Sequence, residues 1–301
     1  MNPRLRFRDR SLCRNGSNGT VSAAVSLGVA AALAFLPMGA AAQSPATGQA
    51  VAAPAQPTYA ELVELASAAD AVLRVAVTDQ ATVKAERAPG LAAGMARLYL
   101  ETATESLLAA PRAVGSSNAF LVDMPLTSRG KAPRLKDARY LIFADFVPGR
   151  AGELQLVNPG AMLPADPVLE QRAADVIRQL TDAGGVGALP TGIRDVISIP
   201  GNLAGESETQ MFIETGSGTP VSLSVIRRPG MAPEWGVSWS EIVDQSASAP
   251  QPETLGWYRL ACFLPQQLSR DAFLQDDPAS RSRAIEDYDF VLNSLGPCSR
   301  R

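Results

Sequence analysis

The stretch AVLRVAVTDQATV, residues 71–83, alternates between apolar and polar side chains for much of its length. Leu73, Val75 and Val77 fall on one face, whereas Arg74 and Thr78 fall on the other. A period of two residues is typical of a strand that buries one face and exposes the other. This stretch therefore predicts a long strand of an antiparallel sheet.

The same period continues toward residue 157. Turns rich in Gly and Pro separate four more segments, RLYLETATESLL (97–108), AFLVDM (119–124), RYLIFADFV (139–147) and ELQLV (153–157). Five strands in such a short segment predict a small antiparallel β-barrel or sandwich, similar to an OB-fold.

Helix signals flank these strands. Thr58 and Glu61 form a capping-box pattern that opens a short helix. Asp166 before Pro167 predicts the start of a second helix, which ends at Gly184. We therefore expect a first domain, barrel-like with a terminal helix, over residues 58–184.

A second domain is expected over residues 190–301. VISIP (196–200), ETQMFIET (208–215), PVSLSVIRR (220–228) and EWGVSWSEIV (234–243) predict a β-meander. PETLGWYRLACFLP (252–265) fits helix better than strand, and a last helix follows Asp277. The fold class is α+β, with C-terminal helices packing the meander.

Residues 1–42 resemble an export signal. Five arginines precede an apolar core that ends in small residues before Gln43. An uncleaved anchor is the alternative, because the core is nearly long enough to span a bilayer. With cleavage we expect a flexible leader over residues 43–57, no remaining membrane span, and a periplasmic or secreted protein.

The charge balance restricts the class of partner. Residues 1–42 hold five of the 27 basic and one of the 30 acidic residues, so the remaining chain has 22 basic and 29 acidic residues, a net charge of −7. An acidic chain is not expected to bind nucleic acid, because such binding depends on neutralising phosphates.

Cys262 and Cys298 are the cysteines that remain after cleavage. Two cysteines of an exported protein are expected to pair, so the sequence predicts a disulfide between them. The chain contains no histidine, which excludes Ser-His-Asp and Cys-His nucleophiles. We therefore assign no catalytic residue, and we expect neither a metal site nor a cofactor.

The segment RGKAPRLKDAR (129–139) is a candidate binding site. It concentrates basic residues in an acidic protein, and such a reversal can hold an anionic partner, although solvated turn charges also explain it. Ser128 and Lys131 also match the S-x-x-K spacing of a serine-lysine pair, but Gly130 and the flanking prolines disfavour the helix that this pair needs. The candidate binding residues are Arg129, Lys131, Arg134 and Lys136.

Glu206 and Glu208 are the candidate paired carboxylates. Two such groups can perform the acid and base steps of glycoside cleavage. The alternative is a loop that leads into a strand, because a glycosidase sets its carboxylates across a cleft.

Trp235 and Trp239 share one face of a predicted strand, downstream of Arg227 and Arg228. They would form either an exposed platform for sugar or peptide, or part of the core.

Two resemblances add expectations. The strand order of residues 58–157 is similar to that of secreted netrin-like modules, which implies an OB-like barrel and an inhibitor or protective role. Three segments resemble exported alphaproteobacterial proteins of unknown function: PGNLAGESETQMF (200–212), SEIVDQSA (240–247) and WYRLACFLP (257–265). This resemblance transfers no catalytic residue to the chain, because that group has no assigned activity.

These observations favour a non-catalytic binding or scaffolding protein of the cell envelope, whose partner is an envelope protein or glycan. The alternative is a histidine-free hydrolase that acts on envelope polymers through paired carboxylates.

Overall fold

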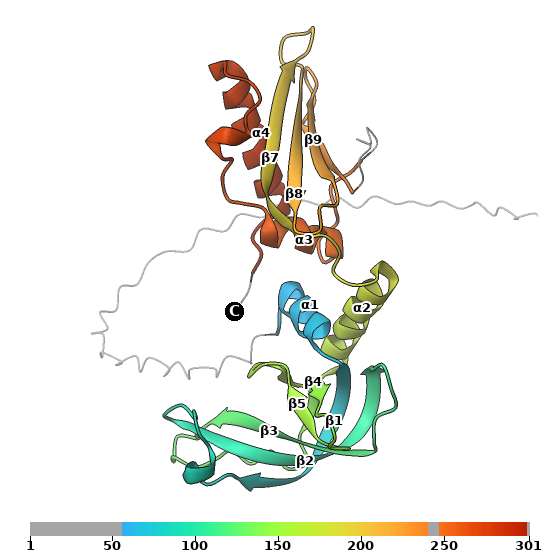
Figure 1. Ribbon diagram of the computed structural model, residues 1–301, viewed down its shortest axis with the longest axis vertical. Helices are drawn as coiled ribbons and strands as arrows, with labels where there is room; N and C mark the ends of the chain where they lie inside the picture. Colours follow the sequence, from blue (N-terminus) through green and yellow to red (C-terminus); the bar gives the residue numbers. More distant parts are fainter. Residues whose placement is uncertain (1–55, 240–246, 300–301) are drawn as a thin grey trace, which may run out of the picture. The chain divides into compact units, whose positions relative to one another are not determined.

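The chain forms two antiparallel sheets with four α-helices in a computed structural model that describes residues 56–239 and 247–299 (Figure 1). The predicted α+β class is therefore confirmed. The predicted signal (1–42) and nearly all of the predicted leader (43–57) lie outside the described residues. No helix of the described ranges is both long enough and apolar enough to cross a bilayer.

The first sheet has the strand order β3-β2-β1-β4-β5, and β6 also pairs with β4. One isolated parallel bridge joins Ala119 of β3 to Glu153 beside β5, so the sheet curls toward closure without becoming a closed barrel. The sandwich-like alternative is thus the one observed. The strands are β1 (Ala71–Thr82), β2 (Met95–Ala109), β3 (Ser117–Pro125), β4 (Arg139–Phe146), β5 (Leu154–Leu156) and β6 (Met162–Pro164).

The alternation in residues 71–83 is the reason for this sheet. Leu73, Val75 and Val77 are buried in one core with Leu98 and Phe120 from the neighbouring strands. Burying side chains of this size stabilises the fold by roughly 1.5–3 kcal/mol each. The first half of β1 pairs with both β2 and β4, so it lies between these two strands.

Helices α1 (Tyr59–Ala68) and α2 (Pro167–Ala183) lie side by side (Figure 1). The Thr58 side chain accepts from the Glu61 amide and Glu61 caps in return, as predicted. The Asp166 carboxylate accepts two amides of the first turn of α2, and Gly184 ends α2 with φ 67°. Both helices share a core with α3, in which Tyr59 meets Trp257 edge to face.

The second sheet is a meander of order β10-β9-β8-β7. Helix α4 packs along β7 and β8 (Figure 1). Its residues Tyr288 and Val291 are buried in the core that the helix shares with this sheet. The elements are β7 (Pro190–Pro200), β8 (Ser207–Thr215), β9 (Val221–Arg227), β10 (Glu234–Ser238), α3 (Leu255–Phe263) and α4 (Pro278–Leu295).

Both outer strands of this meander are covered by the chain itself. The Leu274 amide donates to the Val196 carbonyl at 3.0 Å, beside a bridge between Val196 and Phe273. On the other side the Val237 amide donates to Ser248 at 3.4 Å, and a Cβ at Gly236 would overlap the Ala247 backbone. Unpaired strand edges invite association with other chains, and these contacts cover part of each edge.

Two predicted boundaries differ from the structure. Strand β7 begins at Pro190, before the predicted VISIP, because its pairing with β8 extends to Thr215 through two register shifts. Helix α3 begins at Leu255 because Thr254 provides the N-cap by accepting from the Trp257 amide. Residues 240–243, the end of the predicted fourth strand, lie outside the described residues.

Cys262 in α3 and Cys298 after α4 form the predicted disulfide, with an S–S distance of 2.05 Å. Their Cα atoms are 5.0 Å apart, which is a normal span for a disulfide. The bond therefore fastens the end of α4 to α3.

Candidate functional site

Two loops meet at one end of the first sheet. Residues 83–94 join β1 to β2, and residues 126–138 join β3 to β4. The Leu126 amide donates to the Gly94 carbonyl at 2.8 Å, and Gln80 bonds the backbone of Pro133 and Leu135. These contacts hold both loops against the same strand ends.

Six exposed cations lie on these two loops, and we call them the basic surface. None of the six forms an ion pair or a side-chain hydrogen bond within the described part of the chain. An exposed charge without a partner in the protein remains available to an outside ligand, with water and salt screening its field. The basic surface consists of Lys84, Arg87, Arg129, Lys131, Arg134 and Lys136.

Three carboxylates, those of Asp79, Glu86 and Asp137, lie in the same loops and strand end. No ion pair joins them to the basic surface in the described residues. Asp137 adopts a left-handed conformation, with φ 70°, and its amide donates to the Val77 carbonyl at 2.9 Å. The surface therefore carries more positive than negative charge, and its loop backbone is anchored.

Most arginines elsewhere in the described chain are already paired. Arg97 makes a two-pronged bond to Asp123 at 2.7 and 2.8 Å, and this bond lowers the pKa of the Asp123 carboxyl. Arg139, at the end of the predicted basic segment, binds Glu105 at 2.9 Å. Arg139 is therefore not part of the basic surface.

Ser128 and Lys131 lie in a tight turn and not on a helix. Both the amide and the hydroxyl of Thr127 donate to the Lys131 carbonyl, and Gly130 adopts φ 68°. An L side chain is strained at that φ, which is why glycine stands there. The geometry matches the predicted inter-strand loop.

The side chains of Glu206 and Glu208 make separate contacts. The Glu206 carboxylate accepts from the amides of Asn202 and Leu203 at 3.0 and 3.2 Å, closing the loop before β8. Gly201 is required there, because a Cβ would overlap the Glu206 side chain. Glu208 accepts from Gln210 on the exposed side of β8. The two carboxylates serve the loop and the strand surface separately.

Trp235 is a core residue, so of the two alternatives, exposed platform or core, the structure shows the core at this position. Its side chain is 8% exposed, and its Nε1 donates to Ser294 Oγ at 2.9 Å. Trp239 is half-buried under Arg259, whose Cζ lies 4.3 Å from the ring centre. Burial lowers the pKa of that guanidinium. The two tryptophans thus belong to the packing of α3 and α4.

A buried carboxylate, Asp287, joins α4 to the second sheet. It is fully buried and accepts from Arg227 Nε and from the Thr209 hydroxyl, both at 2.5 Å. Ser198 Oγ lies 2.8 Å from the same hydroxyl. Since these groups satisfy one another inside the fold, they are structural.

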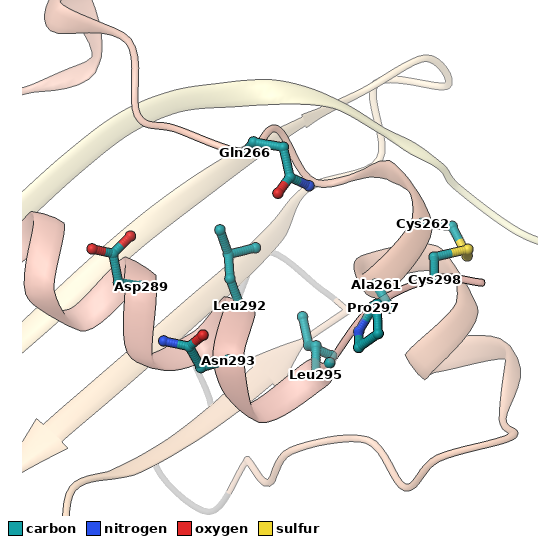
Figure 2. Close-up of a pocket in the computed structure, with 10 residues that line it drawn as sticks. Ala261, Cys262, Gln266, Asp289, Leu292, Asn293, Leu295, Pro297 and Cys298 are labelled. Atoms are coloured by element: carbon teal, nitrogen blue, oxygen red, sulfur yellow. A yellow bond between two sulfur atoms is a disulfide. The ribbon is translucent and has the colours of Figure 1, made fainter.

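A hollow of about 760 Å³ lies beside the disulfide. Figure 2 shows the residues that line it. Gln266, after α3, lies opposite Asp289 and Asn293 of α4, and Leu292 lies on the same helix face. The carboxylate of Asp289 is the one acidic group among the lining residues. This hollow offers hydrogen-bonding groups and no pair of carboxylates.

Two carboxylates do line another hollow, of about 430 Å³, where Glu61 and Glu64 lie one turn apart on α1. Glu61 already accepts from the Thr58 amide at 2.6 Å as part of the capping box. Across the described ranges, no group of three or more His, Cys, Asp or Glu residues is placed to hold a metal ion.

Lys84 and Arg87 were missed as site residues by the sequence reasoning. The signal was present, because consecutive antiparallel strands place the β1–β2 and β3–β4 connections at the same end of a sheet. What could not be deduced is that Gln80 ties the second loop to the end of β1.

No protein-family model and no curated protein sequence matches this chain. The function of this protein is therefore inferred from the geometry of its described residues.

Proposed function

We propose that this protein is a non-catalytic binding protein of the cell envelope that holds an anionic glycan on its basic surface. The observation that carries this proposal is the set of six exposed cations that have no partner among the described residues, where most of the other arginines are paired. A polyanion supplies many weak contacts to such a surface, and its binding falls as salt screens the charges. The location in the envelope rests on the export signal expected from residues 1–42.

Glycan is favoured over an acidic protein because the basic surface consists of two polar loops with few large apolar side chains. Interfaces between proteins usually contain a buried apolar or aromatic centre. The hydrolase alternative receives no support from Glu206 and Glu208, since the Glu206 carboxylate already closes its own loop.

The test compares two variants that remove the same charge from different places. One replaces Arg129, Lys131, Arg134 and Lys136 by Gln. The matched control removes four exposed cations outside the basic surface, Arg178, Arg194, Arg228 and Arg270. The probes are polygalacturonate, a polycarboxylate, and uncharged dextran, with binding measured by calorimetry at low and at physiological salt.

The proposal expects salt-sensitive binding of polygalacturonate and none of dextran, lost in the loop variant and kept in the control. Equal binding by both variants would contradict it. So would capture of an acidic envelope protein through these loops with no binding of polygalacturonate.

A further inference from the structure

A third hollow lies at the end of the first sheet opposite the basic surface, where the β2–β3 loop (110–116) faces the β4–β5 loop (147–153). Its volume is about 470 Å³, within the roughly 300–1,000 Å³ of small-molecule sites. These loops lie close together because Ala119 of β3 forms a parallel bridge with Glu153 and the Ala119 amide donates to the Gly152 carbonyl at 2.8 Å.

One cation in this hollow lacks a polar partner. Arg112 Cζ lies 4.0 Å from the centre of the Phe146 ring, and no acceptor within the described part of the chain binds its guanidinium. A cation held over an aromatic face is attracted to the ring, while the guanidinium N–H groups point outward in their own plane. Arg112 is therefore positioned by Phe146 and still able to donate.

The second cation of the hollow is neutralised. Arg150 Nη1 binds Glu153 at 3.0 Å within the same loop. The ionised side chains of the hollow therefore leave a net charge of +1, that of Arg112. Apart from Asn118, the rest of its lining is small or apolar and includes Val114, Val147 and Leu154.

The loop that carries Arg112 is fixed from inside the sheet. Asn118, 4% exposed, donates to Thr104 Oγ1 at 2.7 Å and to the Gly115 carbonyl at 3.1 Å. The Thr104 hydroxyl also donates to Gly115 at 2.8 Å. A loop ordered in advance loses less conformational entropy when a ligand binds.

We propose that this hollow is a binding site for a small monocarboxylate with an apolar segment. The guanidinium of Arg112 takes the carboxylate through paired N–H donors, and Phe146, Val114 and Leu154 cover the apolar segment. A guanidinium fork matches a carboxylate in shape and charge, and one uncompensated cation matches one anionic group. This site is separate from the basic surface and does not depend on its function.

The experiment titrates the whole protein with hexanoate and follows backbone amide shifts by NMR. Hexylamine and hexanol, which lack the carboxylate, are the ligand controls. We expect saturable shifts at the 110–116 and 147–153 loops with hexanoate alone. Arg112→Gln should weaken binding roughly 10- to 100-fold, the usual range for losing a charged hydrogen-bonding partner.

Two further variants separate the roles. Phe146→Leu keeps the charge and removes the ring, so it should weaken hexanoate binding while the amide spectrum stays dispersed. Arg270→Gln removes an exposed arginine from another element and should leave the affinity unchanged. Non-saturating shifts, equal binding of hexylamine, or unchanged affinity in Arg112→Gln would each overturn the proposal.

Discussion

A buried carboxylate that contacts the second sheet and the exposed cations at one end of the first sheet have opposite roles. In the second sheet the fully buried Asp287 is bound by Arg227 and Thr209, so its charge holds α4 in place. In the first sheet, six cations at one end have no partner in the described residues and carry no part of the packing. The difference separates charges that stabilise the fold from charges that remain available to a ligand.

The disulfide stabilises the fold, as Asp287 does, and removing it should have the largest effect on the free energy of unfolding. Cys262 and Cys298 are 36 residues apart, which corresponds to a stabilisation of about 4 kcal/mol in the chain-entropy model. We expect Cys262→Ser with Cys298→Ser to lower the free energy of unfolding by about that amount in urea. Binding at the basic surface should persist below the transition. A change under about 1 kcal/mol would show that the bond is not a clamp.

Asp287 provides the next largest effect. Asp287→Ala leaves Arg227 and Thr209 without their acceptor, and breaking a buried pair costs about 3 kcal/mol or more. Urea unfolding should show this loss. Asp289→Ala, on the same helix but exposed, should change stability by less than about 0.5 kcal/mol. If both variants unfold alike, the buried network is not what holds α4.

Tyr59 lies where α1 meets α2 and α3, and it gives a pH test. Burial, and then the charge of Glu253, raise the pKa of Tyr59 from 10.0 to about 12. The folded state therefore prefers the neutral phenol, so this contribution is complete below pH 10 and is lost as the pH rises from 10 to 12. After allowance for solvent screening we expect about 1 kcal/mol.

The measurement is the urea midpoint at pH 9 and at pH 11.5 for the wild type and Tyr59→Phe. The variant should lose less stability between these values. Some loss should remain, because burial also raises the pKa of Tyr288. An equal loss of stability between pH 9 and pH 11.5 in both proteins would contradict the assignment of this pH dependence to Tyr59.

The smallest effect is expected at the basic surface. Replacing Arg129, Lys131, Arg134 and Lys136 by Gln should shift the free energy of unfolding by less than about 0.5 kcal/mol per site, because exposed side chains without contacts contribute little. Thermal unfolding by circular dichroism would measure this. A decrease of several kcal/mol in the free energy of unfolding would show instead that these cations stabilise the fold.

Much of the architecture follows from local patterns. The period of two in residues 71–83 predicted β1, and Asp166 with Pro167 predicted the start of α2, because these signals depend on a few neighbouring residues. Trp235 shows the limit. Its face of β10 is read from the sequence, but whether that face meets solvent depends on α4, which supplies Ser294 from far along the chain.

The candidate sites divide in the same way. Four of the six cations of the basic surface were identified from the local reversal of charge, whereas Lys84 and Arg87 joined them through strand pairing. Arg112 and Phe146 gave no signal in the sequence, because Arg112 lies in the β2–β3 loop and Phe146 at the end of β4, and these segments meet only in the folded sheet.

The sequence by itself determined the α+β class, the helix caps, the pairing of the two cysteines and the absence of histidine chemistry. These depend on composition and on neighbours a few residues apart. Only the tertiary structure decided which charged groups are paired, because folding determines which side chains come close enough to form an ion pair and which guanidinium groups have no acceptor nearby. That is why Asp287 became part of the fold and the basic surface did not.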